Sequence, residues 1–293
     1  MKGIQEEKIR SVLHQMGISD VRALSQFQNE EDQDYYNVWR VDTPAQSFVL
    51  KRAKGYEIET YRSFFTQESE YAPRMFGAAE MDGEDYLLLE FVQGRNMMRC
   101  SREDLTRALD AMIAMQKVHW NDSAQASVGQ SFERSMQGRQ NRRNYLLDPR
   151  LEAAYDAYLA EYTRIPRTLC HDDLLPFNVI CSDSRAVFID WEYGGILPYP
   201  TSIARLIAHS QEDVDTFFYM KDADKHEAVE RYYHELVSHH GISYDDFCRS
   251  LDLFLFYEYC EWVYVGNKYG ETDTDRFRQY HKLATEMAAK LGF

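Results

Sequence analysis

Residues 170–180 of the chain read CHDDLLPFNVI, and residues 187–192 read VFIDWE. Together they form the pattern H-x-D-x4-N around Asp173 and Asn178, followed by a short apolar run that ends in Asp190. A short apolar run of this kind, bounded by polar residues, predicts a buried strand. We therefore expect a loop and a strand end that present these three side chains to one cleft.

Transfer of a phosphoryl group explains this spacing. One carboxylate has to accept the proton of the attacking hydroxyl, while an amide oxygen and a second carboxylate hold Mg²⁺ against the nucleotide phosphates. Taken singly, an Asp or an Asn in such a loop is more often an ordinary turn residue. The order, the spacing and the flanking strands together favour the catalytic interpretation.

The two motifs resemble those of the aminoglycoside phosphotransferase and choline kinase superfamily. CHDDLLPFNVI and IDWEYGG look most like its bacterial choline/ethanolamine kinase branch, and protein kinases carry the related segments H-R-D-x4-N and D-F-G. The resemblance implies ATP as the phosphoryl donor and Asp173 as the catalytic base. It also implies Asn178 and Asp190 as Mg²⁺ ligands, with His171 bracing the catalytic loop.

A lysine closes an apolar run earlier in the chain, SFVLKR at residues 47–52. By the same resemblance it would bind the α and β phosphates, and a carboxylate on the next helix would hold it. Glu57 fits that position best and Glu59 is the alternative. The segment EFVQG, residues 90–94, resembles the hinge whose backbone groups bind adenine. The predicted nucleotide-binding residues are therefore Lys51, Glu57, Glu90, Phe91 and Val92.

The hydrophobic patterning changes near residue 93. Strand patterns and two helical patterns precede it, and mostly helical patterns follow it, apart from a β-rich stretch between residues 168 and 190. We expect an α+β, bilobal protein-kinase-like fold with a small β-rich N-lobe and a larger, mostly helical C-lobe. Residues 1–92 would form the nucleotide-binding lobe and residues 93–293 the catalytic and substrate-binding lobe, with the hinge at 90–94.

The expected elements can be given by their ranges. Strands are predicted at 21–27, 35–41, 47–52 and 86–92. Helices are predicted at 4–16, 55–65, 102–119, 133–147, 150–163, 201–211, 224–239, 244–265 and 273–291.

Composition narrows the classes of partner. The 293 residues include 33 Lys and Arg against 48 Asp and Glu, a formal charge of −15, which argues against nucleic acid as a partner and is compatible with a cationic ligand.

Five scattered cysteines without a CxxC pair suit reduced thiols and a cytoplasmic protein. The most apolar stretch, residues 251–265, contains three carboxylates, so we expect no membrane insertion. The oligomeric state stays open.

The acceptor side is predicted from FYEYCEWVY, residues 256–264, which is dense in aromatic rings and carboxylates. Such a set suits an ammonium group through cation–π and Coulomb attraction; a helix packed into the core by its rings is an equally good interpretation. By resemblance, choline kinases use an aromatic box and aminoglycoside kinases use acidic patches. The candidate acceptor residues are Glu192, Tyr257, Glu258, Glu261, Trp262 and Tyr264.

Two departures from the family pattern leave a rival interpretation. The stretch at residues 26–34 has four carboxylates and no glycine where a small-residue loop is expected, and SIAR, residues 202–205, stands where the resemblance predicts DLAR. Both would suit a non-catalytic or regulatory kinase-fold binding protein. A protein kinase is disfavoured because D-F-G and A-P-E segments are absent from the sequence.

The leading hypothesis is therefore an ATP- and Mg²⁺-dependent phosphotransferase that moves the γ-phosphoryl group to a hydroxyl of a small, cationic alcohol. The sequence leaves choline, ethanolamine, an aminoglycoside, a sugar or another alcohol open as the acceptor.

Overall fold

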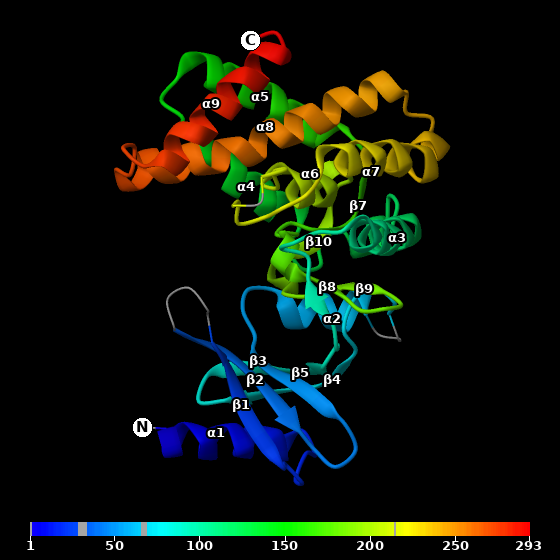
Figure 1. Cartoon of the computed structure of the whole chain (residues 1–293), viewed down its shortest axis with the longest axis vertical. Coiled ribbons are helices and arrows are strands. Elements are labelled where there is room, and N and C mark those ends of the chain that lie inside the picture. Colours follow the sequence, from blue (N-terminus) through cyan, green and yellow to red (C-terminus); the bar gives the residue numbers. More distant parts are fainter. Residues whose placement is uncertain (1, 29–33, 66–68, 214) are drawn as a thin grey trace.

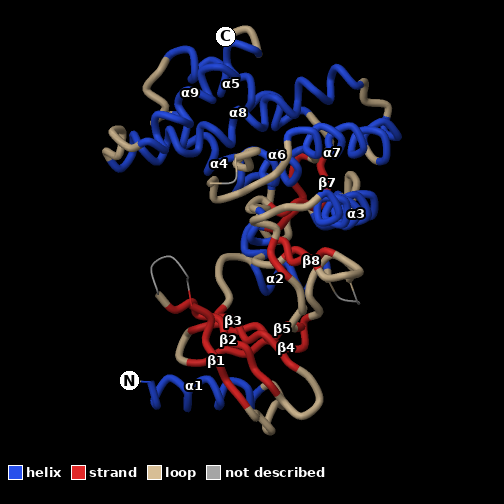
Figure 2. Tube along the Cα trace, in the orientation of Figure 1, coloured by secondary structure: helices blue, strands red, loops and turns tan. Residues whose placement is uncertain are grey.

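The computed structural model describes residues 2–28, 34–65, 69–213 and 215–293. Figure 1 shows a small part that contains a β-sheet and two helices, joined to a larger part made mostly of helices. Figure 2 shows the same division by secondary structure, with the longest strands gathered at the end that carries the N-terminus. The mixed α+β architecture predicted from the patterning is confirmed.

The small part is built on a five-stranded antiparallel sheet with the strand order β1-β2-β3-β5-β4. The alternation of side chains along a strand gives this sheet two different faces. In β3, Phe48 and Leu50 are buried on one face, whereas Lys51 lies on the other. The strands are β1 (Ala23–Gln28), β2 (Tyr35–Asp42), β3 (Ser47–Arg52), β4 (Met75–Met81) and β5 (Glu84–Glu90).

A helix packs on each face of this sheet. Helix α1 (Lys2–Gln15) places Ile9, Val12 and Leu13 in a cluster with the buried side of β3. Helix α2 (Glu57–Phe64) lies on the other side, and its aromatic residues belong to the large core that extends into the helical part. Lys51 and α2 therefore face the space between the two parts.

The connection between the two parts runs directly after β5. The chain passes from Glu90 to the short strand β6 (Arg95–Asn96), which pairs with β8 (Val179–Cys181), and β8 pairs with β9 (Ala186–Phe188). A Cβ atom on Gly94 would lie 2.4 Å from the carbonyl oxygen of Cys181. Only glycine lets the connection lie this close to the strand that leaves the predicted catalytic loop.

Five helices of the larger part begin at residues whose side chains cap them. Ser101 forms a capping box with Asp104, and Asp148 caps a helix that has a proline in its first turn. Strand β7 (Arg167–His171) pairs with β10 (Gly194–Pro198) beneath these helices. The helices are α3 (Arg102–Val118), α4 (Phe132–Arg143), α5 (Pro149–Arg164), α6 (Pro200–Ala208), α7 (Asp222–Glu235), α8 (Tyr244–Tyr269) and α9 (Asp275–Lys290).

The two-residue strand β6 and two longer strands were not predicted. β4 reads MFGAAEM, whose small residues lack the strict alternation of a half-buried strand, and β10 reads GGILP, which looks like a turn by its glycines and proline. Both form because their neighbours β5 and β7 supply the hydrogen-bonding partners. The acidic stretch at residues 29–33 lies outside the described residues. None of the helices that are described is long and apolar enough to cross a bilayer.

The close approach at Gly94 can be tested by replacing it with alanine. We expect Gly94→Ala to lower the free energy of unfolding by about 1–3 kcal/mol, because the new methyl group has to displace backbone. Gly138→Ala in α4 is the matched control, since its Cβ meets nothing within 4 Å; it should raise stability by up to about 1 kcal/mol through helix propensity. Urea titrations followed by circular dichroism measure both. A Gly94→Ala variant as stable as the wild type would contradict the contact.

Candidate active site

The predicted catalytic loop begins at His171, the last residue of β7. Its ring is fully buried, Nε2–H donates to the carbonyl of Ile189 at 2.8 Å, and Nδ1 accepts from the backbone N–H of Asp173 at 3.2 Å. Burial lowers the pKa of His171, so the neutral ring that these two bonds require is also the favoured form. His171 thus ties the loop to the residue before Asp190.

Asn178 closes the same loop. Its side-chain nitrogen Nδ2 donates to the backbone carbonyl of Asp173 at 2.8 Å, and its backbone carbonyl accepts from the N–H of Ile189 at 2.9 Å. Among the described residues no donor bonds to its Oδ1 atom, which is left for a ligand. The turn is fixed by Pro176, which begins a short 3₁₀ segment.

Asp173 is held through one of its two oxygens. Arg205 of α6 donates to Oδ1 from Nη2 at 2.7 Å and from Nε at 3.2 Å. Burial raises the pKa of Asp173 above its usual range, although Arg205 opposes the shift. The side chain keeps 29% of its surface exposed, so it can still be reached from solvent.

Three charged side chains meet between the sheet and the helical part. Lys51 of β3 donates to Oε1 of Glu57 at 2.9 Å and also donates to Oδ1 of Asp190. Burial raises the pKa of Glu57 to about 7, with Lys51 opposing. Burial alone would lower the pKa of Lys51, but the two carboxylates outweigh it and raise that pKa. Glu59, the other candidate partner, is exposed.

The backbone at Asp190 is left-handed, with φ 67° and ψ 57°. A non-glycine residue in this region costs of order 1–3 kcal/mol and persists only where its surroundings fix it. Trp191 supplies that constraint, because it is fully buried and its Nε1–H donates to the carbonyl of Phe188 at 2.7 Å. Its ring lies 4.7 Å from those of His171 and Phe65.

Helix α2 is docked on this same segment. The N–H of Tyr56 donates to the carbonyl of Glu192 at 3.2 Å, and the hydroxyl of Thr60 lies 3.3 Å from the carbonyl of Gly194. Lys51, Glu57 and Asp190 are therefore brought into direct contact. His171, Asp173 and Asn178 form a second set, and the two sets meet at Ile189.

Two of the three predicted hinge residues have side chains that contact other side chains of the protein. Glu90 pairs with Arg185 at 2.7 Å across the connection, and Phe91 lies 4.4 Å beneath the guanidinium of Arg40. Val92 is half-buried. A role in nucleotide binding would therefore fall to their backbone groups, and it stays a prediction.

The donor set suits Mg²⁺ that is shared with a nucleotide. Asn178 Oδ1 and the Asp190 carboxylate are hard oxygen ligands, and Mg²⁺ typically takes one or two carboxylates and completes its shell with phosphates and water. Within the described ranges no three His, Cys, Asp or Glu side chains are grouped as a metal site. The residues present thus fit a metal held partly by the substrate.

Comparison with known proteins decides the family. A model of the phosphotransferase enzyme family matches residues 28–235. The chain belongs to the phosphotransferase enzyme family. Membership confirms the superfamily resemblance and supports a small-molecule substrate. Two LicA proteins of Haemophilus influenzae are 31% identical over 127 residues, which is 42% of this chain and 42% and 33% of theirs, so the match spans less than half of those relatives.

Solved structures agree on the fold of this phosphotransferase. A choline/ethanolamine kinase family protein from Mesorhizobium loti has a TM-score of 0.62 at 14% identity, covering 98% of this chain and 94% of its own. Choline kinase from Cryptosporidium parvum gives 0.61 at 13%, covering 97% of both chains. A putative fructosamine-3-kinase from Haemophilus somnus gives 0.57 at 12%, covering 98% of both. Likeness at this level of identity shows the kinase-like fold alone.

Most of the residues predicted to bind the acceptor already contact other side chains of the phosphotransferase. Glu258 is buried and accepts from Arg205 at 2.7 Å, and Glu261 accepts from the hydroxyl of Tyr257 at 2.9 Å and pairs with Arg142. The aromatic faces are also contacted by cations of the chain. Arg139 lies over Tyr257, Arg276 over Trp262 and Lys268 over Tyr264, each 4.5–5.0 Å from the ring centroid.

Two arginines of the site were missed by sequence reasoning. Arg205 lies in SIAR, where the sequence pattern was interpreted only at the serine, so a signal for this arginine was present. Arg139 pairs with Asp172 and has no motif around it. Glu192 is half-buried beside Asp190, and its part in acceptor binding stays a prediction.

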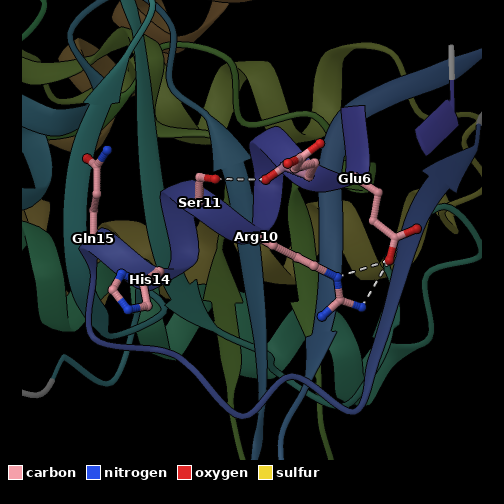
Figure 3. A pocket seen from close by; sticks show the side chains of 6 residues that line it. Glu6, Arg10, Ser11, His14 and Gln15 are labelled. Carbon is pink, nitrogen blue, oxygen red and sulfur yellow. Dashed lines mark hydrogen bonds and ion pairs between the residues drawn. The ribbon is translucent and has the colours of Figure 1, made fainter. Parts of the chain in front are cut away.

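A hollow lined by residues of α1 is unrelated to this site. Figure 3 shows that it lies along the outer surface of α1, where Arg10 pairs with Glu6 and the hydroxyl of Ser11 bonds to the backbone of the preceding turn. The sheet separates this surface from Lys51.

The raised pKa of Glu57 predicts a particular pH dependence of stability. Its ordinary value is 4.5 and its value in the folded protein is about 7, so the folded state binds the proton more tightly. The stability that this group contributes is complete below pH 4.5 and is lost as the pH rises through about 7, by at most about 3 kcal/mol.

Glu57→Gln should remove that loss. As the pH rises from 5 to 7.5, we expect the wild type to lose stability relative to the variant. Urea unfolding measures the free energy of unfolding of both proteins. Glu59→Gln, on the exposed side of the same helix, is the control and should follow the wild type. A pH-independent difference for Glu57→Gln would refute the assignment.

Proposed function

We propose that the chain transfers the γ-phosphoryl group of ATP to a hydroxyl of a small, cationic alcohol, with Mg²⁺ as cofactor. The observation that carries this proposal is the convergence of Lys51, Glu57 and Asp190 beside the loop that holds Asp173 and Asn178. Positioning and charge stabilisation account for nearly all catalysis in this reaction class, and these residues supply both.

In this proposal Asp173 is the general base. Arg205 holds Oδ1, so Oδ2 is available to accept the proton of the acceptor hydroxyl. The acceptor oxygen forms a bond to the γ phosphorus as the bond to the bridging oxygen breaks, and ADP leaves. The proton stays on Asp173 until the product departs.

The donor side depends on the lysine and the two metal ligands. Lys51 would bind the α and β phosphates, with Glu57 keeping its ammonium group in place. Asn178 Oδ1 and the Asp190 carboxylate would hold Mg²⁺, which when bound neutralises charge on the phosphate oxygens. A kinase of similar fold, the amicoumacin kinase hAmiN, with a TM-score of 0.58 at 12% identity, was solved with AMP-PNP and Ca²⁺. That structure supports a nucleotide and a divalent ion as ligands of this fold.

Charge around the base supports a cationic acceptor. Four carboxylates lie there, on Asp172, Asp173, Glu258 and Glu261, against three guanidinium groups on Arg139, Arg142 and Arg205, and the imidazole of His209 lies 3.3 Å from Glu258. One negative charge is left over, which suits an acceptor with a single positive charge. Exposed rings for such a cation are those of Phe177, inside the catalytic loop, and Tyr193, three residues after Asp190.

The direct test is ADP release by the purified chain with Mg·ATP and a panel of choline, ethanolamine, kanamycin and glucose. We expect turnover above the acceptor-free rate with an amino alcohol and its loss on adding EDTA. Absence of turnover with every acceptor, combined with a rise in melting temperature on adding Mg·ATP, would favour the binding-protein alternative.

Two substitutions test the roles of the aspartates. Asp173→Ala and Asp190→Ala should each lower kcat by at least about 10²-fold, because one removes the base and the other a metal ligand. Both variants should keep the wild-type circular dichroism spectrum. Asp183→Ala, in the exposed turn between β8 and β9, is the control. Wild-type turnover in either of the first two variants would overturn the assignment.

A further inference from the structure

A buried arginine contacts the residue next to the proposed base. Arg139 of α4 is 2% exposed, and its Nη2 and Nη1 donate to the two carboxylate oxygens of Asp172 at 2.6 and 3.0 Å. This is the two-pronged geometry in which a guanidinium fixes both the position and the orientation of a carboxylate. Asp172 is the residue between His171 and Asp173, so the pair holds the start of the loop.

The remaining N–H groups of Arg139 are also used. Nε donates to the hydroxyl of Tyr158 at 2.7 Å, and Nη1 bonds to the hydroxyl of Ser135 one helical turn earlier. The guanidinium lies 4.6 Å from the ring centroid of Tyr162 and 4.6 Å from that of Tyr257. A buried charge whose three nitrogens all donate hydrogen bonds, and which also contacts two rings, is held in one position.

This arrangement joins three helices to the loop. Tyr158 and Tyr162 belong to α5 and Tyr257 belongs to α8, so residues of α4, α5 and α8 all meet at this guanidinium. The ring of Tyr257, predicted from the sequence to receive the acceptor, has the chain's own arginine on it. The helix predicted to bind the acceptor is therefore connected to the catalytic loop through Arg139.

On the α6 side, the backbone of the loop at His171 has an uncharged anchor. The hydroxyl of Ser202 on α6 accepts from the N–H of His171 at 2.9 Å, at the position where the resemblance predicts a carboxylate. A serine makes this bond without charge, and charge-assisted bonds are roughly twice as strong as neutral ones. The ion pair from α4 supplies a charged contact one residue further along.

We infer that Arg139 is a positioning residue of this site: through its paired bonds to Asp172 it holds Asp173 where it can accept the proton of the acceptor hydroxyl. This inference rests on the proposed function of Asp173. Arg139 itself touches no reacting atom in this account.

The test compares Asp172→Asn, Arg139→Lys and the double variant Arg139→Met/Asp172→Asn with the wild type. Arg143→Met is the matched control, because Arg143 lies on the same helix but pairs with Glu152 and Asp156 at the surface. The measurements are kcat and the KM for ATP with the best acceptor of the panel above, the unfolding midpoint in urea, and hydrogen–deuterium exchange of residues 171–181.

Asp172→Asn should lower kcat about 10²-fold, the size of effect seen when a reacting group is misplaced, with KM for ATP changed by less than about threefold. Arg139→Lys should fall between this variant and the wild type, because lysine keeps the charge but cannot form paired bonds. Exchange in residues 171–181 should become faster in Asp172→Asn and stay unchanged in Arg143→Met.

The double variant separates positioning from stability. Removing both charges should return the unfolding midpoint toward that of the wild type, since a buried pair replaced by uncharged groups is often neutral for stability. In our account kcat nevertheless stays low. Recovery of kcat together with stability, or Asp172→Asn activity within about threefold of the wild type, would overturn the inference.

Failure of the proposed function gives a different result. If the wild type releases no ADP with any acceptor, the function is wrong. The exchange measurement then still decides whether Arg139 holds the loop: unchanged exchange in Asp172→Asn would overturn that statement, and faster exchange confined to residues 171–181 would support it.

Discussion

The contact on which the site depends is the ammonium group of Lys51 between the carboxylates of Glu57 and Asp190. Glu57 is fully buried and one of its oxygens has no hydrogen-bond partner in the described structure, so the neighbouring cation offsets the cost of burying its ionised form. Lys51 and Glu57 come from a strand and the helix that follows it, whereas Asp190 lies 139 residues beyond Lys51. Their pairing fixes the sheet and α2 against the segment that begins at Asp190.

Rigidity of the catalytic loop comes from several directions. His171 bonds to Ile189 from within, while Arg139 and Arg205 bond to the two adjacent aspartates from α4 and α6. A reaction that depends on positioning needs such preorganisation, because small displacements of the base are costly to the rate. The left-handed backbone at Asp190, enforced by buried Trp191, serves the same purpose on the metal side.

The two-part α+β fold and the motif residues could be predicted because both depend on short-range features of the sequence, namely hydrophobic periodicity and residue spacing. Spacing and periodicity located the strand of Lys51 and the loop from His171 to Asn178. The same reasoning could not identify Arg139 or the partners of Glu258, because long-range ion pairs leave no local signal. The pattern of rings at residues 257–264 suits an external cation and a core-packed helix equally well, and in the structure three of these rings have arginine or lysine of the chain itself on one face. Strand β4 was missed because its small residues gain their strand geometry from β5.

The most direct test is a crystal structure of the chain with Mg²⁺ and AMP-PNP. We predict one metal ion bound by the Asn178 amide oxygen and the Asp190 carboxylate, with Lys51 moved from Asp190 onto the α and β phosphates and Asp173 facing the γ phosphate. A nucleotide bound elsewhere, or a metal that contacts neither Asn178 nor Asp190, would contradict the account.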